Sequence, residues 1–325
     1  MEYGLFSYDK DIKINGCDLW LDAKRVKEFS FVSHAHSDHG ANHRKILASP
    51  PTASLLKHKF GEMKSIELEY EKKFKIGNIT VEIFPAGHIL GSSQILIETN
   101  NSSLLYTGDF KPRSSLTAEK IIIKRAEYLI IESTFGLPKY VFPSRDLVIQ
   151  KLLESLNTCL RRKIIPVLFV YQLGKGQEIT RILTDNNFNV VQHKSIYQIS
   201  KIYESFGIKL GKYELLDTTS LEGKVLLLPP HIRFSRYYTR IKNLKIRKYY
   251  LSGWAMDEES KFKYNVDEVY PISDHADFNE LIEFITLVKP RKVYTTHGFP
   301  EFPEYLRSLG INAEILGKPL QLSII

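Results

Sequence analysis

Cysteine is scarce in this sequence, and long apolar runs are absent from it. The two cysteines, Cys17 and Cys159, lie far apart and form no CxxC motif, which excludes a disulfide framework and favours a reducing compartment. No apolar run approaches the roughly 18 residues that span a membrane, and the residues after Met1 lack the basic and apolar regions of a signal peptide. The sequence therefore predicts a cytoplasmic protein without membrane contact.

Internal repeats, low-complexity tracts and Pro/Gly-rich linkers are also absent, so the 325 residues are expected to fold continuously, as one large domain or two medium ones. Hydrophobic residues make up 43% and charged residues 25%, as in an ordinary globular protein. The net charge is +8 and the pI is about 9.1. A polyphosphate partner would account for this excess, because lysine and arginine neutralise phosphates, but many basic proteins have no such partner. Charge supports a nucleic-acid partner without establishing it.

The pattern of apolar residues changes along the chain. Short strands joined by turns such as 77–78 and 100–101 are expected up to about residue 136. From residue 144 onward strands and helices alternate, which favours βαβ units and a mostly parallel sheet in an α/β protein. The expected strands are 19–21, 29–33, 75–76, 80–84, 94–99, 104–107, 128–132, 164–170, 189–192, 224–228, 249–252, 292–296 and 313–316, and the expected helices are 144–156, 177–183, 196–206, 279–288 and 301–309.

The most informative segment is 31–39, in which an apolar strand runs into a turn with the pattern HxHxDH. Neutral imidazoles and carboxylates are suitable ligands for Zn²⁺ and similar ions. Two residues apart at the end of a strand, His34 and His36 point to the same side. Asp38 and His39 follow on the turn and can address a second ion. The alternative interpretation is four polar residues on a solvated loop, but an HxHxDH match arises only rarely by chance.

Two further candidate ligands follow strand ends. His88 and Asp109 each come directly after a glycine, which lets the backbone turn and brings the side chain close to its neighbours. Taken alone, either residue is more often a simple turn residue. The histidines without a comparable context, which we expect to be ordinary polar positions, are His43, His58, His193 and His231.

A third set of polar residues lies near the C-terminus. His275 and Asp277 precede an expected helix, with Asp277 suited to be its N-cap. His297 ends the expected strand 292–296. A capping residue and ordinary loop histidines would explain this set if the first motif were not present.

The order of these motifs resembles the metallo-β-lactamase-fold nucleases of the β-CASP group, which includes Artemis, RNase J and the cleavage and polyadenylation endonuclease. The resemblance covers nearly the whole chain, and it is closest to the ligase-associated DNA exonucleases of bacteria and archaea. It implies an αββα sandwich built from residues 1–143 and 267–325, with an α/β β-CASP insert at 144–266. The segments that carry it are 4–6, 34–39, 85–92, 107–110, 131–136, 252–254 and 273–277.

Carried over to this sequence, the resemblance implies two divalent ions, zinc or alternatively manganese. One ion would be held by His34, His36 and His88, the other by Asp38, His39 and His297, with Asp109 bridging them. Glu132, His275 and His297 would be the first, second and third β-CASP motifs. A histidine at the third position is typical of RNA-processing members, whereas Artemis-like DNA nucleases commonly lack it, so both substrates stay open.

We expect Asp38 to orient the nucleophile, His275 to protonate the leaving oxygen or stabilise the transition state, and Glu132 to fix the tautomer of His275. Lys175, in the glycine-containing segment 173–177 that opens a helix, is a weaker candidate for a substrate phosphate, since about half of such glycines only make turns.

The predicted function is hydrolysis of DNA, as an exonuclease on single-stranded ends in repair or end processing. RNA processing is the alternative within the group, and the resemblance suggests a DNA ligase or helicase as partner. A small-molecule thioesterase or lactamase-like hydrolase shares the HxHxDH motif but needs neither the insert nor the basic balance. A non-catalytic binding protein is disfavoured because every expected ligand is present.

Overall fold

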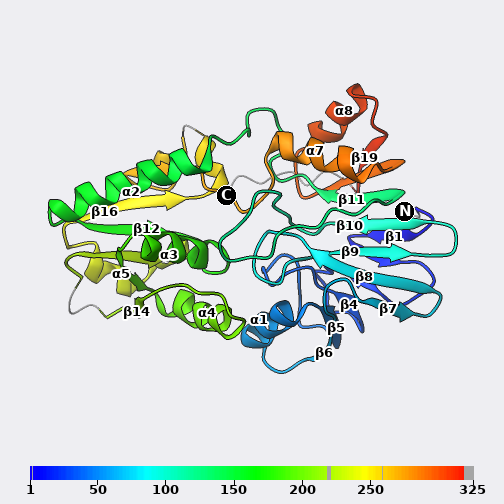
Figure 1. Cartoon of the computed structure of the whole chain (residues 1–325), viewed down its shortest axis with the longest axis horizontal. Coiled ribbons are helices and arrows are strands. Elements are labelled where there is room, and N and C mark those ends of the chain that lie inside the picture. Colours follow the sequence, from blue (N-terminus) through cyan, green and yellow to red (C-terminus); the bar gives the residue numbers. More distant parts are fainter. Residues whose placement is uncertain (2, 218–220, 258, 318–325) are drawn as a thin grey trace. The chain divides into compact units, whose positions relative to one another are not determined.

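The computed structural model of the chain describes residues 1, 3–217, 221–257 and 259–317, and the chain divides into two compact units (Figure 1). The first unit consists of Met1–Val141 together with His275–Ile325, and the second unit is Phe142–Asp274. All the predicted metal ligands belong to the first unit.

Two β-sheets form the first unit. The order of one sheet is β1-β2-β3-β4-β5-β6, and that of the other is β19-β18-β11-β10-β9-β8-β7. Strands of the first sheet are β1 (Phe6–Asp9), β2 (Asp11–Ile14), β3 (Trp20–Leu21), β4 (Ser30–Phe31), β5 (Lys45–Ala48) and β6 (Lys64–Glu67). Strands of the second sheet are β7 (Lys73–Ile76), β8 (Ile79–Pro85), β9 (Ser93–Glu98), β10 (Ser103–Tyr106), β11 (Tyr128–Glu132), β18 (Lys292–Thr296) and β19 (Ala313–Ile315).

The alternation of side chains along each strand explains how these sheets pack. On β10, Leu104 and Tyr106 join an apolar core together with Phe31 and Leu47 of the other sheet. Between them, Leu105 points to the opposite face and packs with residues of a helix. Because successive side chains of a strand point to opposite faces, the sheet buries both of its surfaces.

Helices cover the outer faces of these sheets. The helix α1 (Pro50–Phe60) contacts β5 and β6, while α7 (Phe278–Val288) and α8 (Glu301–Ser308) pack on the second sheet (Figure 1). Asp277 caps α7 by accepting from the backbone N–H of Glu280, as its sequence position predicts. The layers are therefore helix, sheet, sheet, helix, and the predicted αββα class is confirmed.

Four strands of the second sheet end at the same edge. β8 and β10 are both antiparallel to β9 and so run in the same direction, and β11 and β18 continue parallel to β10. His88 follows β8, Asp109 follows β10, Glu132 ends β11 and His297 follows β18. The sheet topology thus brings four segments that are distant in sequence to one edge.

The second unit is a six-stranded parallel sheet of order β14-β13-β15-β12-β16-β17 with helices between its strands. Its strands read as nearly continuous apolar runs because both faces are covered. Its elements are α2 (Arg145–Arg161), β12 (Ile165–Phe169), α3 (Lys175–Asp185), β13 (Asn189–Gln192), α4 (Lys194–Ser205), β14 (Tyr213–Leu215), β15 (Lys224–Leu228), η1 (Pro230–Phe234), α5 (Arg236–Ile241), β16 (Ile246–Leu251), η2 (Gly253–Met256), α6 (Ser260–Lys263) and β17 (Glu268–Tyr270).

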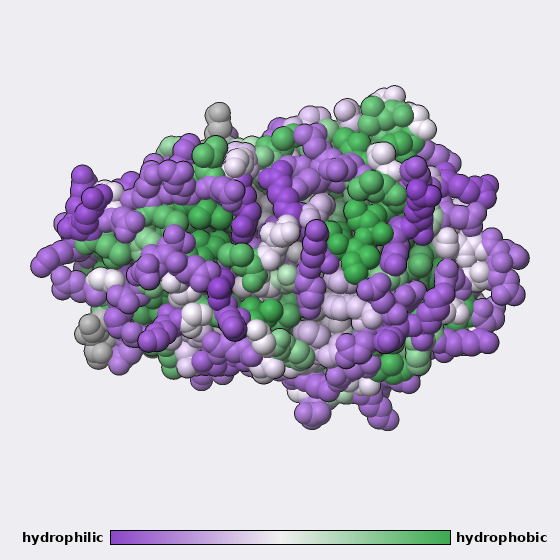
Figure 2. Space-filling view, viewed as in Figure 1, coloured by the Kyte–Doolittle hydropathy of each residue, from purple (hydrophilic) through white to green (hydrophobic). Residues whose placement is uncertain are grey.

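No helix in the described part of the chain combines the length and the apolar character needed to cross a bilayer. Polar side chains cover most of the face shown in Figure 2, and apolar side chains lie between them in separate areas.

Candidate metal centre

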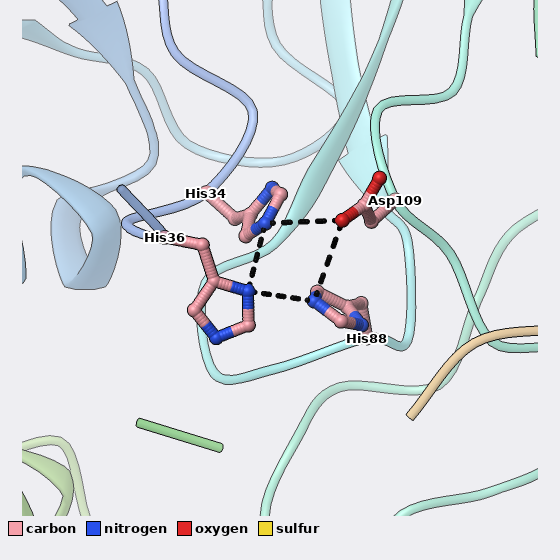
Figure 3. Close-up of side chains that lie close together, drawn as sticks. All are labelled: His34, His36, His88 and Asp109. Atoms are coloured by element: carbon pink, nitrogen blue, oxygen red, sulfur yellow. Dashed lines mark hydrogen bonds and ion pairs between the residues drawn. The ribbon is translucent and has the colours of Figure 1, made fainter. Parts of the chain in front are cut away.

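Three histidines and one aspartate converge at the edge where the strands of the second sheet end (Figure 3). His36 Nδ1 lies 3.1 Å from His34 Nε2 and 3.1 Å from His88 Nε2. Asp109 Oδ2 lies 3.5 Å from His34 Nε2 and 3.9 Å from His88 Nε2. Tetrahedral zinc with Zn–N bonds of about 2.0–2.1 Å separates its ligand nitrogens by roughly 3.3 Å. The spacing of this group therefore matches that of ligands around one ion.

A second group shares Asp109 with the first. It contains His39, Asp109 and His297, whose ligand atoms lie within 4.8 Å of one another. His39 Nε2 is 3.2 Å from Asp109 Oδ2, and the rings of His39 and His297 have their centroids 5.0 Å apart. Asp109 thus belongs to both groups, and the bridging role that the resemblance implies for it stays a prediction.

The glycine before Asp109 explains how that side chain comes so close to the HxHxDH segment. Gly108 has φ +55°, and a Cβ built on it would lie 2.5 Å from the Cβ of Ser33. Any side chain at residue 108 would push these two segments apart. His34, next to Ser33, therefore faces Asp109 across a contact that only glycine permits.

Burial and charge set the protonation of the group. Burial lowers the pKa of His34 well below its ordinary value, and the neighbouring His39 adds to this. Burial, with His39, also lowers the pKa of His297 to about 4. For Asp109 burial acts upward, but the surrounding histidines, His39 first, hold the pKa of the carboxyl well below its ordinary value. His34 and His297 are therefore favoured in the neutral form that can coordinate a cation. For His39 burial acts downward, but the carboxylates of Asp109 and Asp22 raise the pKa of the ring well above its ordinary value, so a bound cation would displace its proton.

The residues present fit a metal. The carboxylate oxygen Asp109 Oδ1 is buried, and no described residue supplies it with a hydrogen-bond donor. A buried, ionised and unsatisfied oxygen is costly in a folded protein. Nitrogen and carboxylate oxygen are the donors that zinc accepts. The imidazole nitrogens face the other oxygen, Asp109 Oδ2, so a divalent cation held among them would neutralise this buried carboxylate.

Glu132 and His275 form a pair beside the first group. His275 Nδ1 lies 3.0 and 2.9 Å from the two carboxylate oxygens of Glu132 and 4.0 Å from Asp109 Oδ2. Glu132 also accepts from the backbone N–H of Phe110 and from the hydroxyl of Thr134. An ionised carboxylate only accepts, so Nδ1 of His275 must carry the hydrogen. The contact is thus suited to fixing the tautomer of His275.

Asp22 is a central residue that sequence reasoning missed. It follows β3 and accepts hydrogen bonds from the backbone N–H and hydroxyl of Ser33, from the hydroxyl of Tyr106 and from Nδ1 of His39. Its side chain could reach a cation together with His34 and His39. Since four donors already occupy its oxygens, we assign it to the orientation of His39. The available signal was its place directly after β3, since Asp109 likewise lies in a segment that follows a strand end.

The structure places the other predicted residues less centrally. The side chain of Asp38 is 63% exposed, and its Oδ2 lies 3.7 Å from His39 Nε2, beside the second group. Its roles as ligand and as orienting residue stay predictions. His43 accepts from the backbone N–H of Lys27, and His193 caps α4, so these two histidines have structural contacts.

Lys175 does not offer its amine to a phosphate. Its Nζ is buried in the second unit and donates to Asp274 Oδ1 and to the carbonyl of Ile272, both at 2.6 Å. The backbone N–H groups of Gly174 and Gly176 bind Gln177 Oε1 and the carbonyl of Tyr171. Because these donors are already used, we do not assign Lys175 to a substrate phosphate.

Comparisons with known proteins agree with this geometry. Residues 261–316 match the family described as "Zn-dependent metallo-hydrolase RNA specificity domain". A probable DNA ligase of Opitutus terrae is 39% identical over 310 residues, covering 94% of this chain and 30% of that protein. An RNase J-like protein of Methanocaldococcus jannaschii is 34% identical, covering 86% of this chain and 83% of that protein. The crystal structure of a protein of unknown function from Enterococcus faecalis has TM-score 0.61 at 19% identity, covering 89% of this chain and 79% of that one.

The sandwich and its histidine–aspartate cluster define a metal-dependent hydrolase of the metallo-β-lactamase fold. The identity to the RNase J-like protein extends over most of both chains. The chain therefore belongs to the β-CASP group of metallo-β-lactamase-fold nucleases, and the resemblance seen in the sequence is confirmed. This chain spans only 30% of the length of the probable DNA ligase of Opitutus terrae.

Proposed function

We propose that the chain is a two-metal nuclease that hydrolyses phosphodiester bonds of DNA, as an exonuclease on single-stranded ends in repair or end processing. The observation that carries this proposal is the pair of ligand groups that share Asp109, with the pair Glu132–His275 beside them. The likeness of the chain to a protein named a probable DNA ligase supports DNA as the substrate and a DNA ligase as a partner. A helicase is the other partner that the resemblance suggests. In this proposal 1–143 and 267–325 form the core and 144–266 is the β-CASP insert.

Two bound divalent ions, zinc on this set of donors, would make hydroxide available near neutrality and neutralise charge on the phosphoryl oxygens. His34, His36 and His88 would hold one side of this centre, and Asp38, His39 and His297 would hold the other. Asp38, exposed beside His39, orients the attacking water.

His275 supplies the proton that the leaving oxygen needs when the P–O bond breaks. Glu132 keeps one hydrogen on Nδ1, so the proton that transfers is the one on Nε2 of the imidazolium. The pair also keeps this ring at a fixed orientation next to Asp109, which lies 4.0 Å from Nδ1. A positioned general acid of this kind accelerates a reaction by about 10²–10⁴-fold.

RNA is the second candidate substrate. Three observations favour it: the presence of His297, the match of 261–316 to a family described by RNA specificity, and the identity to an RNase J-like protein. Both candidates use the same ligands and the same general acid, so the distinction is one of substrate and not of chemistry.

Digestion of end-labelled single strands tests the proposal. Matched DNA and RNA strands, each with a 5′-phosphate or a 5′-hydroxyl, are incubated with protein loaded with Zn²⁺ or Mn²⁺, beside Asp38→Ala. We expect DNA to be shortened from its ends by the wild type and hardly at all by the variant. Preferential loss of RNA would select the second candidate, and no cleavage of either polymer would exclude nuclease function.

A further inference from the structure

Lys59, at the C-terminal end of α1, reaches the metal-binding loop. Its Nζ donates a hydrogen bond of 3.0 Å to Ser37 Oγ, and Ser37 lies between His36 and Asp38 in the HxHxDH segment. Burial lowers the pKa of Lys59, while the carboxylate of Asp38 is near enough to act in the opposite direction. The ammonium group therefore lies beside the exposed rim of the second ligand group.

Packing at both ends of α1 fixes this position. At its start, the hydroxyls of Ser49 and Thr52 both donate to the carbonyl of Gly91, in the loop that follows His88. Near its end, a Cβ built on Gly40, just after the HxHxDH segment, would lie 3.6 Å from Leu56. The helix thus packs against both loops that contain the histidines, so Lys59 extends from a helix that is held at both ends.

The chemistry of this amine suits a phosphate. An ammonium group has three donors, and the bond to Ser37 uses one of them. Among the described residues no ion pair engages Lys59, and the neighbouring Asp38 side chain is 63% exposed, so this rim is open to solvent. Lysine binds phosphate oxygens as a point charge and has no need of a planar partner.

We propose that Lys59 binds a backbone phosphate of the nucleic-acid strand next to the bond that is cut. This proposal rests on the proposed nuclease function and adds to it a named contact with the substrate. Such a contact is independent of base sequence and applies to DNA and RNA alike. It holds the strand in register over the metal ligands and takes no part in the proton transfers.

The same helix offers a matched control. Lys57 lies two residues before Lys59, but its Nζ is 2.9 Å from Glu67 Oε1 and forms an ion pair with it. Replacing Lys57 by alanine removes the same charge from the same helix. It leaves the contact with Ser37 in place, so net charge and helix propensity change equally in the two variants.

The test compares Lys59→Ala, Lys59→Arg and Lys57→Ala with the zinc-loaded wild type. Binding of a phosphorothioate-linked single strand that resists hydrolysis is measured by fluorescence anisotropy over a range of salt concentrations, beside KM and kcat on the normal strand. Thermal midpoints show whether each variant is folded.

We expect Lys59→Ala to weaken binding and raise KM by about fivefold to tenfold with kcat nearly unchanged. The slope of log affinity against log salt should fall by about 0.7, the value for one phosphate contact on a single strand. Lys59→Arg should keep most of the affinity, and Lys57→Ala should behave as wild type.

Equal affinity and salt slope in Lys59→Ala and wild type would overturn the proposal, as would equal losses in Lys57→Ala and Lys59→Ala. The binding arm separates this result from a failure of the proposed function. A wild type that binds the resistant strand through Lys59 but cuts no strand would retain this contact and exclude the nuclease. A wild type that cuts normally but binds the resistant strand no better than Lys59→Ala would exclude the Lys59 contact and retain the nuclease function.

Discussion

The carboxylate of Asp22 accepts a hydrogen bond from Nδ1 of His39 at 2.8 Å, and this bond leaves Nε2 of His39 facing Asp109 at 3.2 Å. In a neutral imidazole, when one ring nitrogen donates its hydrogen to a carboxylate, the other nitrogen keeps the lone pair that can bind a metal. Asp22 thereby sets which atom of His39 is offered to a metal. Because the side chains of both residues are buried, the ring has little freedom to turn.

Replacing Asp22 by asparagine should weaken metal binding about 10- to 100-fold, the range typical of a residue that orients a ligand. An amide oxygen in the place of Oδ2 can accept from both His39 and Tyr106, but the NH₂ group in the place of Oδ1 then faces the backbone N–H of Ser33. Zinc affinity can be measured by competition with a chromophoric chelator. Tyr106→Phe, which removes one donor to Asp22 and keeps its charge, should lose less affinity, and an unchanged affinity in Asp22→Asn would contradict the role.

His275→Ala should lower kcat by about 10²–10⁴-fold while leaving bound zinc unchanged, because His275 is proposed to move a proton rather than to hold an ion. Glu132→Gln should lower kcat less, since glutamine can still accept from Nδ1 with its oxygen. Elemental analysis of the purified variants beside steady-state kinetics checks both statements. A loss of zinc in His275→Ala would instead make this residue a ligand.

Gly91→Ala should destabilise the first unit more than Gly61→Ala does. Both residues have positive φ, +78° and +85°, so an alanine at either position strains the backbone by about 1–3 kcal/mol. A Cβ at residue 91 would also lie 2.8 Å from the Cβ of Pro51 and 2.8 Å from the backbone nitrogen of Thr52, whereas nothing lies within 4 Å of one at residue 61. Thermal midpoints of the two variants measure the difference, and equal midpoints would show that the contact with α1 relaxes without cost.

Asp11→Asn should destabilise the protein at neutral pH and lose this effect in acid. Burial raises the pKa of Asp11, but bonds from Lys27, Arg25 and the backbone N–H of Lys24 outweigh it and leave the pKa below its ordinary value. A lowered pKa means that the folded state favours the ionised carboxyl, so the stabilisation is complete above the unfolded value of about 3.9 and is lost as pH falls through the folded one.

The cost of this variant at pH 7 should be about 1–3 kcal/mol, as for a buried hydrogen bond to a charged group. Urea unfolding can be followed by the fluorescence of Trp20, whose ring centroid lies 3.6 Å from Lys27 Nζ. The difference between wild type and Asp11→Asn should shrink progressively below about pH 4. A difference that grows toward low pH would contradict the sign of the shift.

Much of the site could be predicted from the sequence because its ligands occur in local patterns. The HxHxDH segment places three histidines within six residues, and His88 and Asp109 follow glycines at strand ends. Asp22 has no such pattern. Two of its partner residues, Ser33 and His39, lie in the segment after β4, and the third, Tyr106, lies on β10 of the other sheet, so its role exists only after the two sheets have packed. Lys175 shows the opposite case. Its local segment predicts phosphate binding, but its amine already donates to the buried side chain of Asp274.

The fold was predicted most closely at four strands that pair in parallel with their neighbours. The bounds of β11, β13, β15 and β18 agree with expectation at every residue. The helix α1 was not predicted. Its first two residues are prolines, which are well tolerated at a helix start but give no apolar period of their own. The short strands β1, β2, β5 and β6 were also missed, since runs of four partly polar residues carry little periodic signal.

The pairing of β11 with β18 joins chain segments made at very different times. β11 ends at Glu132, whereas β18 begins at Lys292, after the whole second unit. A ribosome must therefore have synthesised that unit before His297 can take its place beside His39. If the protein is a nuclease, its growing chain cannot complete the centre before the whole second unit has been synthesised.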